Sequence, residues 1–162
     1  MKINNIITAF LLVAATITNG QGNSKEVNKS GFYAAMASES LDSVNAQLNQ
    51  IAKTSGNGKD ALEGVLLMKK AGLVSGPGRK LKLFKSGNKK LESAIEKDSK
   101  NAEFRFFRLM IQENAPGILN YNGKIEEDSE LIKSEYKNLS QDAQKAIAGY
   151  AKKSKVLKPE SL

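Results

Sequence analysis

The chain has 162 residues, with 25 lysines and arginines against 17 acidic residues, so its formal net charge is +8. It contains no histidine, cysteine or tryptophan. Neither a Ser-His-Asp nor a Cys-His nucleophile system can therefore be built, and zinc sites made of cysteine and histidine are excluded. Any catalysis would have to use Asp, Glu, Lys, Tyr, Ser or Thr. We identify no catalytic, cofactor-binding or metal-binding residue from the sequence.

Residues 1–20 have the pattern of a secretory signal peptide. Lys2 supplies a short positive region, residues 6–15 form a run that is apolar except for one threonine, and small residues follow up to Gly20. The run is too short for a good membrane span, although an uncleaved N-terminal anchor is the alternative. We expect an exported protein, periplasmic or secreted, in which residues 21–30 form a flexible lead-in.

Two segments, 38–53 and 59–74, are predicted to form the first antiparallel helix hairpin. Ser38 or Ser40 is expected to cap the first helix, and a glycine-rich turn separates the two segments. Apolar residues recur at helical spacing along the first segment, at Leu41, Val44, Leu48 and Ile51. Residues 32–36 are expected to add a helical turn or two before this hairpin.

The segment 81–117 reads as two helices joined by a tight turn and is predicted to be the centre of the domain. Apolar residues cover two adjacent faces of the second helix, with Phe104, Phe107 and Ile111 on one and Phe106 and Met110 on the next. A helix with so wide an apolar surface must be covered on more than one side. The Pro-Gly pair at the end of the segment stops the helix.

The first helix of this pair carries a glycine in its middle, Gly87, which costs about 1 kcal/mol relative to alanine. Either another helix approaches closely here, or a weak position is simply tolerated. The order of Gly87, Leu91, Ala94 and the segment 98–103 resembles a degenerate tetratricopeptide repeat, with Ser99 where the repeat usually has proline. The arrangement is also similar to small exported helical proteins of Bacteroidota. The resemblance implies antiparallel hairpins stacked side by side, with a concave surface suited to binding proteins.

The segment 115–124 mixes proline, glycine and asparagine with three large apolar residues, Ile118, Leu119 and Tyr121. These side chains either cover the bottom of the core or form a binding loop, since binding residues concentrate on positioned loops. We keep Leu119 and Tyr121 as candidate binding residues.

Two more helices are expected, one from Ile125 with acidic residues in its first turn and one capped by Ser140. The basic tail, 154–162, is expected to fray. Because no segment alternates at period two, we predict an all-α fold with about six helices in two to three antiparallel hairpins. Residues 31–153 would form a single helical domain.

The stretch 69–90 carries eight basic residues and no acidic one. They form either a solvated face or a surface that attracts anionic lipid, acidic glycan or an acidic protein. Lys82, Lys85 and Lys89 are the candidate contacts. Nucleic acid is disfavoured as a partner by the predicted export and by the lack of aromatic residues among the lysines.

Arg105 and Arg108 on the predicted central helix lie beside extensive apolar surface. Each is therefore either paired with a carboxylate or directed into a groove, and the candidate carboxylates are Glu103, Glu113 and the acids at 126–130. The same acids could supply paired carboxylates for hydrolysis, although acids at a helix N-terminus also explain them.

Together these features favour an exported, non-enzymatic helical scaffold that binds an envelope protein or peptide. The first alternative is an electrostatic binder of anionic envelope polymers or lipids through residues 69–90. The second is a carboxylate-based hydrolase. The candidate binding residues are Arg105, Arg108, Leu119, Tyr121, Lys82, Lys85 and Lys89.

Overall fold

The computed structural model describes residues 27–56 and 58–162, which are all-helical and contain no strand. The predicted signal peptide and the lead-in as far as residue 26 lie outside this part of the chain. The α-helices are α1 (Lys29–Ala37), α2 (Leu41–Ala52), α3 (Lys59–Leu73), α4 (Pro77–Lys97), α5 (Ala102–Asn114), α6 (Ile125–Glu135) and α7 (Gln141–Ala151). Three short 3-10 helices connect or follow them: η1 (Gly117–Leu119), η2 (Tyr136–Asn138) and η3 (Pro159–Ser161).

The all-α prediction is confirmed, but seven helices are found in the described residues rather than about six. The difference is α1, which is a full helix and not one or two turns. The Asn28 side chain caps it by accepting a hydrogen bond from the Gly31 N–H, and the buried Phe32 anchors its inner face. The helix α4 also begins four residues earlier than expected, because Gly76 turns the chain at φ 87° and Pro77 suits the first helical position.

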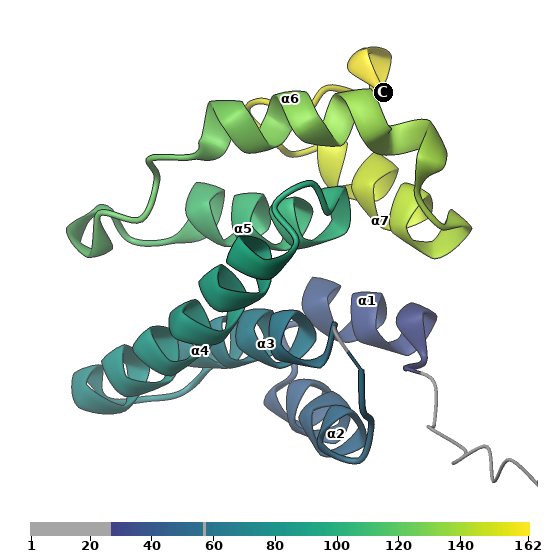
Figure 1. Ribbon diagram of the computed structural model, residues 1–162. Coiled ribbons are helices and arrows are strands. Elements are labelled where there is room, and N and C mark those ends of the chain that lie inside the picture. The colour runs from purple at the N-terminus through teal and green to yellow at the C-terminus, as the bar shows by residue number, and fades with distance from the viewer. Residues whose placement is uncertain (1–26, 57) are drawn as a thin grey trace, which may run out of the picture.

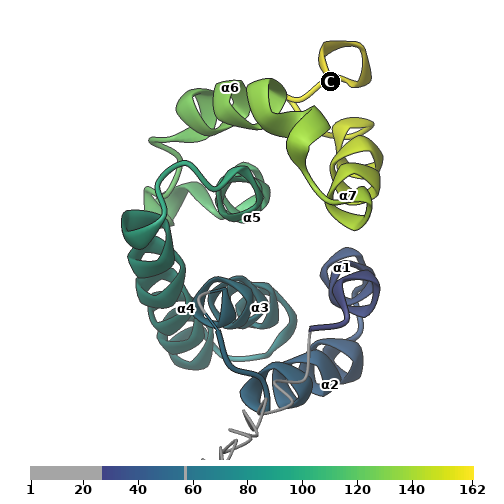
Figure 2. The same cartoon turned by 45° about the vertical axis from the view of Figure 1, so that its right-hand side comes forward.

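The helices follow one another around a curve, with α3 and α5 inside and α4 and α6 outside (Figures 1 and 2). The first and last helices, α1 and α7, contact each other on the side opposite α4. The chain therefore closes on itself around its inner helices. Within residues 27–56 and 58–162, none of the helices has the length and apolar character needed to cross a bilayer.

The helix α5 lies at the centre of the core, as its two apolar faces predict. Phe106 and Phe107 are both fully buried on it. The Phe107 ring packs against Phe32 of α1 with ring centroids 5.2 Å apart, and the Phe106 ring packs edge-on against Tyr150 of α7 at 5.7 Å. Because neighbouring residues of α5 face different helices, this one helix joins both ends of the chain.

A second link between α1 and α5 is polar. The Glu103 carboxylate accepts hydrogen bonds from the Lys29 ammonium, at 2.7 and 2.8 Å, and from the Tyr33 hydroxyl at 2.5 Å. Burial and the Glu103 charge both raise the pKa of Tyr33 above its ordinary value of 10, so Tyr33 stays a hydrogen-bond donor at neutral pH.

The closest approach of two helices is the crossing of α3 and α4 at Gly64 and Gly87. A Cβ atom added at Gly87 would lie 2.5 Å from the Gly64 carbonyl oxygen and 2.6 Å from the Met68 Cγ. One added at Gly64 would lie 2.8 Å from the Gly87 oxygen. The mid-helix glycine in α4 is therefore required by a neighbouring helix and is not a tolerated weak position.

The C-terminal tail does not fray, so that expectation is wrong. Leu157 is fully buried in the core. The Ser154 hydroxyl and the Lys155 backbone N–H donate hydrogen bonds to the two oxygens of Glu113, at 2.8 and 2.7 Å. The Glu113 carboxylate on α5 thus provides hydrogen-bond acceptors for the Ser154 hydroxyl and the Lys155 N–H and ties the tail to the core.

The glycine crossing generates a stability prediction. Changing Gly87 to alanine should lower the free energy of unfolding by about 1–3 kcal/mol, because the new methyl group overpacks the contact with α3. Gly149 of α7 has nothing within 4 Å of an added Cβ, so Gly149→Ala is the matched control. We expect the control to raise stability by up to about 1 kcal/mol. Urea denaturation of both variants measures the difference, and equal effects would contradict the crossing.

Candidate binding groove

A large cavity of about 860 Å³ lies among the inner helices. Its walls come from α1, α3, α5 and α7, together with the first turns of α4 and the loop that follows α5. The floor is apolar, formed mainly by Met36, Met68, Phe84, Phe106, Met110, Ile111, Ala146 and Tyr150. We call this cavity the groove. Its volume falls within the range typical of ligand sites.

The groove contains Met36, Met68 and Met110, which are all the methionines of the chain apart from Met1. Methionine side chains are unbranched and polarisable, so they adapt their shape to different apolar partners. Their concentration in one cavity is typical of a binding surface that accommodates variable apolar side chains.

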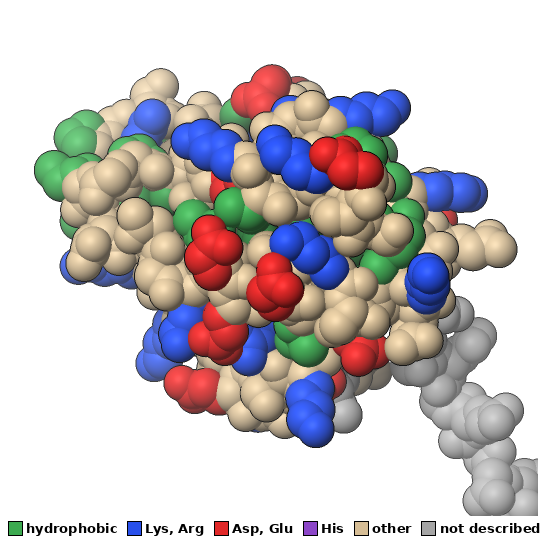
Figure 3. Space-filling view, turned by 90° about the horizontal axis from the view of Figure 1, so that it is seen from above, with side chains coloured by type: hydrophobic (Ala, Val, Ile, Leu, Met, Phe, Trp, Pro, Cys, Tyr) green, Lys and Arg blue, Asp and Glu red, His purple; other side chains and the backbone are tan. Residues whose placement is uncertain are grey.

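Two large apolar side chains stand exposed at the rim of the groove. Ile118 is 94% exposed and Leu81 is 43% exposed. Figure 3 shows hydrophobic side chains gathered at the end of the molecule where Figure 1 places the loop between α5 and α6. Leu119 of the same loop also lines the groove. Ile118 and Leu119 therefore extend the apolar wall outward and do not cover the core.

The rim also carries positive charge. Lys80 of α4, Lys145 of α7 and Lys153 in the turn after α7 are exposed and make no ion pair with any described residue. The remaining rim lysine, Lys69, contacts Glu39 at 2.8 Å. Glu39 is the one acidic residue among the described residues that line the groove, so the rim has a positive excess.

Behind the groove, Asp128 of α6 binds both arginines of α5. The Asp128 side chain is 0% exposed. One oxygen accepts from the Arg108 Nη2 at 2.6 Å and from the Arg105 Nη1 at 2.9 Å, and the other accepts from the Arg108 Nε at 2.7 Å. Neither arginine lines the groove. The pairing interpretation of Arg105 and Arg108 therefore holds, and they are not groove contacts.

A third helix joins this cluster through Glu92 of α4. Its carboxylate accepts a hydrogen bond from the Arg108 Nη1 at 2.7 Å and one from the Tyr121 hydroxyl at 2.5 Å. The Tyr121 ring packs edge-on against Phe84 with centroids 5.5 Å apart. Since Phe84 lines the groove, the ion cluster fixes the position of one groove wall. Tyr121 therefore supports Phe84 from behind and does not itself line the groove.

Arg108 stays charged in this cluster. Burial opposes its charge, but the hydrogen bonds and charges of Asp128 and Glu92 outweigh that cost and raise the pKa of Arg108 above its ordinary value. Burial, together with the hydrogen bond to Glu92, also raises the pKa of Tyr121. Arg108 and Tyr121 therefore both remain protonated across the neutral pH range.

The candidate lysines of α4 lie on a different surface. Lys82, Lys85 and Lys89 are exposed and share one helix face, since they are spaced three and four residues apart. None of them lines the groove or pairs with a described acid. By contrast, Lys90 of the same basic stretch contacts Asp60 and Glu63 at 3.3 Å. Part of the stretch 69–90 is thus neutralised, while the three candidate lysines remain on the outer face.

The acids at the start of α6 are mostly occupied by cations. Glu127 accepts hydrogen bonds from Lys124 and Arg105 at 2.8 and 2.9 Å, and Glu130 pairs with Lys133 at 2.9 Å. Asp128 is held by two arginines. Of the four acids at the start of α6, only Glu126 makes no ion pair with a described residue, so they offer no pair of free carboxylates.

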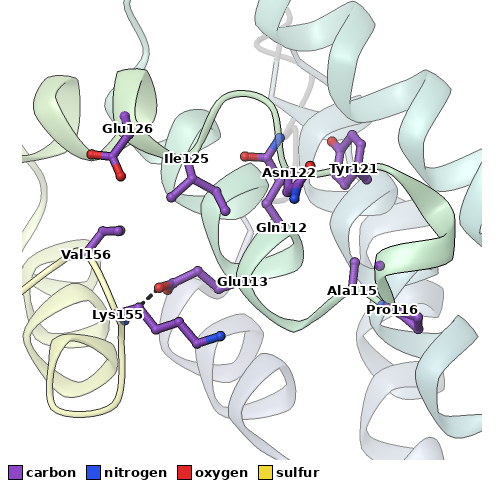
Figure 4. A pocket seen from close by; sticks show the side chains of 11 residues that line it. Gln112, Glu113, Ala115, Pro116, Tyr121, Asn122, Ile125, Glu126, Lys155 and Val156 are labelled. Atoms are coloured by element: carbon purple, nitrogen blue, oxygen red, sulfur yellow. Dashed lines mark hydrogen bonds between the residues drawn. The ribbon is translucent and has the colours of Figure 1, made fainter.

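Glu126 lines a second, smaller cavity of about 360 Å³. Figure 4 shows Gln112, Tyr121 and Glu126 around it, with Glu113 directed to the backbone of Lys155. Both oxygens of Glu113 are engaged by the C-terminal segment. Glu113 therefore holds the tail in place and is not arranged with Glu126 as an acid and base pair.

Comparison with known proteins adds no assignment: no protein family, curated protein or solved structure matches this chain.

The resemblance to stacked hairpins implies a concave surface, but the lining of the groove was not predicted from the sequence, because it comes from segments that lie far apart along the chain. Among the candidate binding residues, Leu119 lines the groove, as does Ile118 of the same loop. Glu92 was also missed as a partner of Arg108, since it lies on the preceding helix and no spacing rule points to it.

Asp128→Asn tests the cluster. It preserves the shape of the side chain but leaves two arginines without their buried counter-charge, which should cost about 3 kcal/mol or more in the free energy of unfolding. The matched control is Glu130→Gln, which removes an exposed pair and should change stability by about 0.5 kcal/mol or less. Denaturant titration gives both values, and a small effect at position 128 would contradict the role of the cluster.

The exposed edge of the cluster titrates in acid. Hydrogen bonds from Lys124 and Arg105 lower the pKa of Glu127 from its ordinary value of 4.5 to about 2. Because the folded-state pKa is the lower one, Glu127 stabilises the fold above about pH 4.5, and that contribution is lost as the pH falls toward 2. The pH dependence of unfolding between pH 5 and pH 2 should therefore be shallower in Glu127→Gln than in the wild type. Identical slopes would contradict the assignment.

Proposed function

We propose that this protein is a non-enzymatic helical scaffold that binds a partner protein or peptide in the groove. The observation that carries the proposal is an apolar cavity of about 860 Å³ that is rimmed by the exposed Ile118 and Leu81. Soluble proteins rarely expose contiguous apolar surface unless it binds something. The adaptable methionine floor supports the same conclusion.

The arrangement of the helices supports a tetratricopeptide-like stacking as part of the proposal. The odd-numbered helices line the groove, while α2 and α6 lie outside it and α4 contributes only its first turns (Figure 2). The helix α3 contacts both α4 and α5, as the first helix of one hairpin contacts that of the next in stacked hairpins. Small residues also stand at the crossing of α3 and α4.

Export to the cell envelope or beyond is a further part of the proposal and rests on the signal-peptide pattern of residues 1–20. It makes an envelope protein or peptide the natural partner. The electrostatic alternative has one specific observation in its favour, which is the exposed face of Lys82, Lys85 and Lys89. The hydrolase alternative has none, because Glu127, Asp128 and Glu130 of α6 are occupied by cations. The other carboxylate in the cavity of Glu126, that of Glu113, is engaged by the C-terminal segment.

The two binding surfaces can be separated by mutation. Gly149 lines the groove, is exposed and has open space around its Cβ position, so Gly149→Trp should fill the groove without disturbing α7. Changing Lys82, Lys85 and Lys89 together to glutamine removes the outer basic face and leaves the groove intact. Both variants and the wild type are tagged and used to capture partners from an envelope extract of the source cells, at low and at high salt.

We expect the wild type and the glutamine variant to retain the same protein at high salt, because apolar contacts are not screened, and Gly149→Trp to lose it. Gly149→Ala is the control for the tryptophan. Capture that survives Gly149→Trp but disappears in the glutamine variant or at high salt would reject the groove in favour of the basic face.

A further inference from the structure

The position of the rim lysines restricts what the groove can hold. This inference rests on the proposed function and concerns the chemistry of the bound partner. Lys145 lies on α7, and Lys153 lies in the turn that ends this helix, where the Lys153 and Ser154 N–H groups both bond to the Tyr150 carbonyl. At the rise of a helix, the eight residues between the two lysines correspond to about 12 Å. Lys80 stands on α4, a separate wall. One carboxylate or one lipid headgroup cannot contact lysines placed so far apart, so the arrangement suits a ligand with several negative charges.

The floor between these lysines takes apolar side chains. Met68, Phe106 and Met110 come from α3 and α5 and offer no charged group. A fitting ligand is therefore apolar along one face and acidic along its edges. The rim acid nearest to these lysines, Glu39, is already paired with Lys69, so it leaves the positive excess in place.

The walls also determine the backbone conformation of the ligand. They are mostly helices, whose main-chain N–H and C=O groups bond within each helix except in the end turns, so they offer no continuous edge to a strand. The side-chain amide of Asn114 is engaged as well, by the Met110 carbonyl and the Tyr150 hydroxyl. A peptide buried here must satisfy its own backbone hydrogen bonds, which a helix does and an extended chain does not.

We infer that the groove binds an acidic amphipathic helix of a partner protein. Its apolar residues recur at i, i+3 or i+4, and i+7 and contact the methionine floor. At least two Asp or Glu residues, about two helical turns apart, contact Lys145 of α7 and Lys153 of the turn that follows it. The acidic residues fix the register of the helix, while the apolar residues supply most of the affinity.

A random peptide library tests this without knowledge of the natural partner. Displayed peptides of about 14 residues, or about 21 Å as a helix, are selected on the purified wild type and in parallel on Gly149→Trp. Peptides enriched on the wild type alone should combine the apolar spacing with acidic residues about two turns apart. Enriched peptides without acidic residues would overturn the inference but leave the groove as a peptide site. If no peptide distinguishes the two proteins, the proposed function fails as well.

Charge reversal gives the second measurement. For the best acidic peptide, Lys145→Glu with Lys153→Glu should weaken binding about tenfold or more at low salt. A peptide with its glutamates changed to lysines should bind the reversed variant and not the wild type. The matched control is Lys82→Glu with Lys85→Glu, the same charge change on the outer face of α4, which should change affinity by about twofold or less. Equal losses in the two variants would overturn the inference.

The experiments also distinguish an acidic helix from two other occupants of the groove. If a second copy of the chain fills the groove, light scattering will show a dimer that Gly149→Trp dissociates, and the inference is overturned. If a long-chain fatty acid such as oleate displaces the selected peptides but binds equally well to the Lys145 and Lys153 variant, the site is a lipid site. That result also overturns it.

Discussion

The carboxylate of Asp128 is the contact on which the rest of the structure depends. It lies fully buried on α6 and binds the two arginines of α5, while Glu92 of α4 completes the charge balance of Arg108. Removing these charges from water costs several kcal/mol per ion, so the cluster adds little net stability. Its effect is geometric, because a bidentate arginine pair has one good arrangement and therefore fixes the angles among three helices.

The ion cluster is connected to the groove by the contact between the Tyr121 and Phe84 rings. Glu92 also accepts the Tyr121 hydroxyl, and the Tyr121 ring supports Phe84, which lines the groove. On the other side, the glycine crossing brings the backbones of α3 and α4 into close contact, because neither Gly64 nor Gly87 has a side chain. One wall is thus held by charge and the neighbouring wall by close backbone packing. An apolar cavity persists between them because both walls are fixed from behind and cannot collapse inward.

The opposing wall depends on the ends of the chain. Phe107 of α5 packs on Phe32 of α1, and Phe106 packs on Tyr150 of α7. The tail is held in turn by Glu113 and by the buried Leu157. The helices α1 and α7, which lie far apart in the sequence, therefore both contribute to this wall of the groove. Because the groove is lined by helices from most of the domain, variants that alter the core packing should change its shape and therefore affect binding as well as stability.

Local physical chemistry in the sequence determined the helices themselves. Ser40, Asn101 and Ser140 cap the helices they precede, and the two apolar faces of α5 require a central position. Gly87 indicated a close neighbour without naming it. Tertiary structure alone decided that the neighbour is Gly64, that Arg108 pairs with Glu92 and Asp128, and that four helices enclose a groove. Capping and amphipathicity act within a few residues, whereas these contacts join residues 16 or more positions apart, which no local pattern encodes.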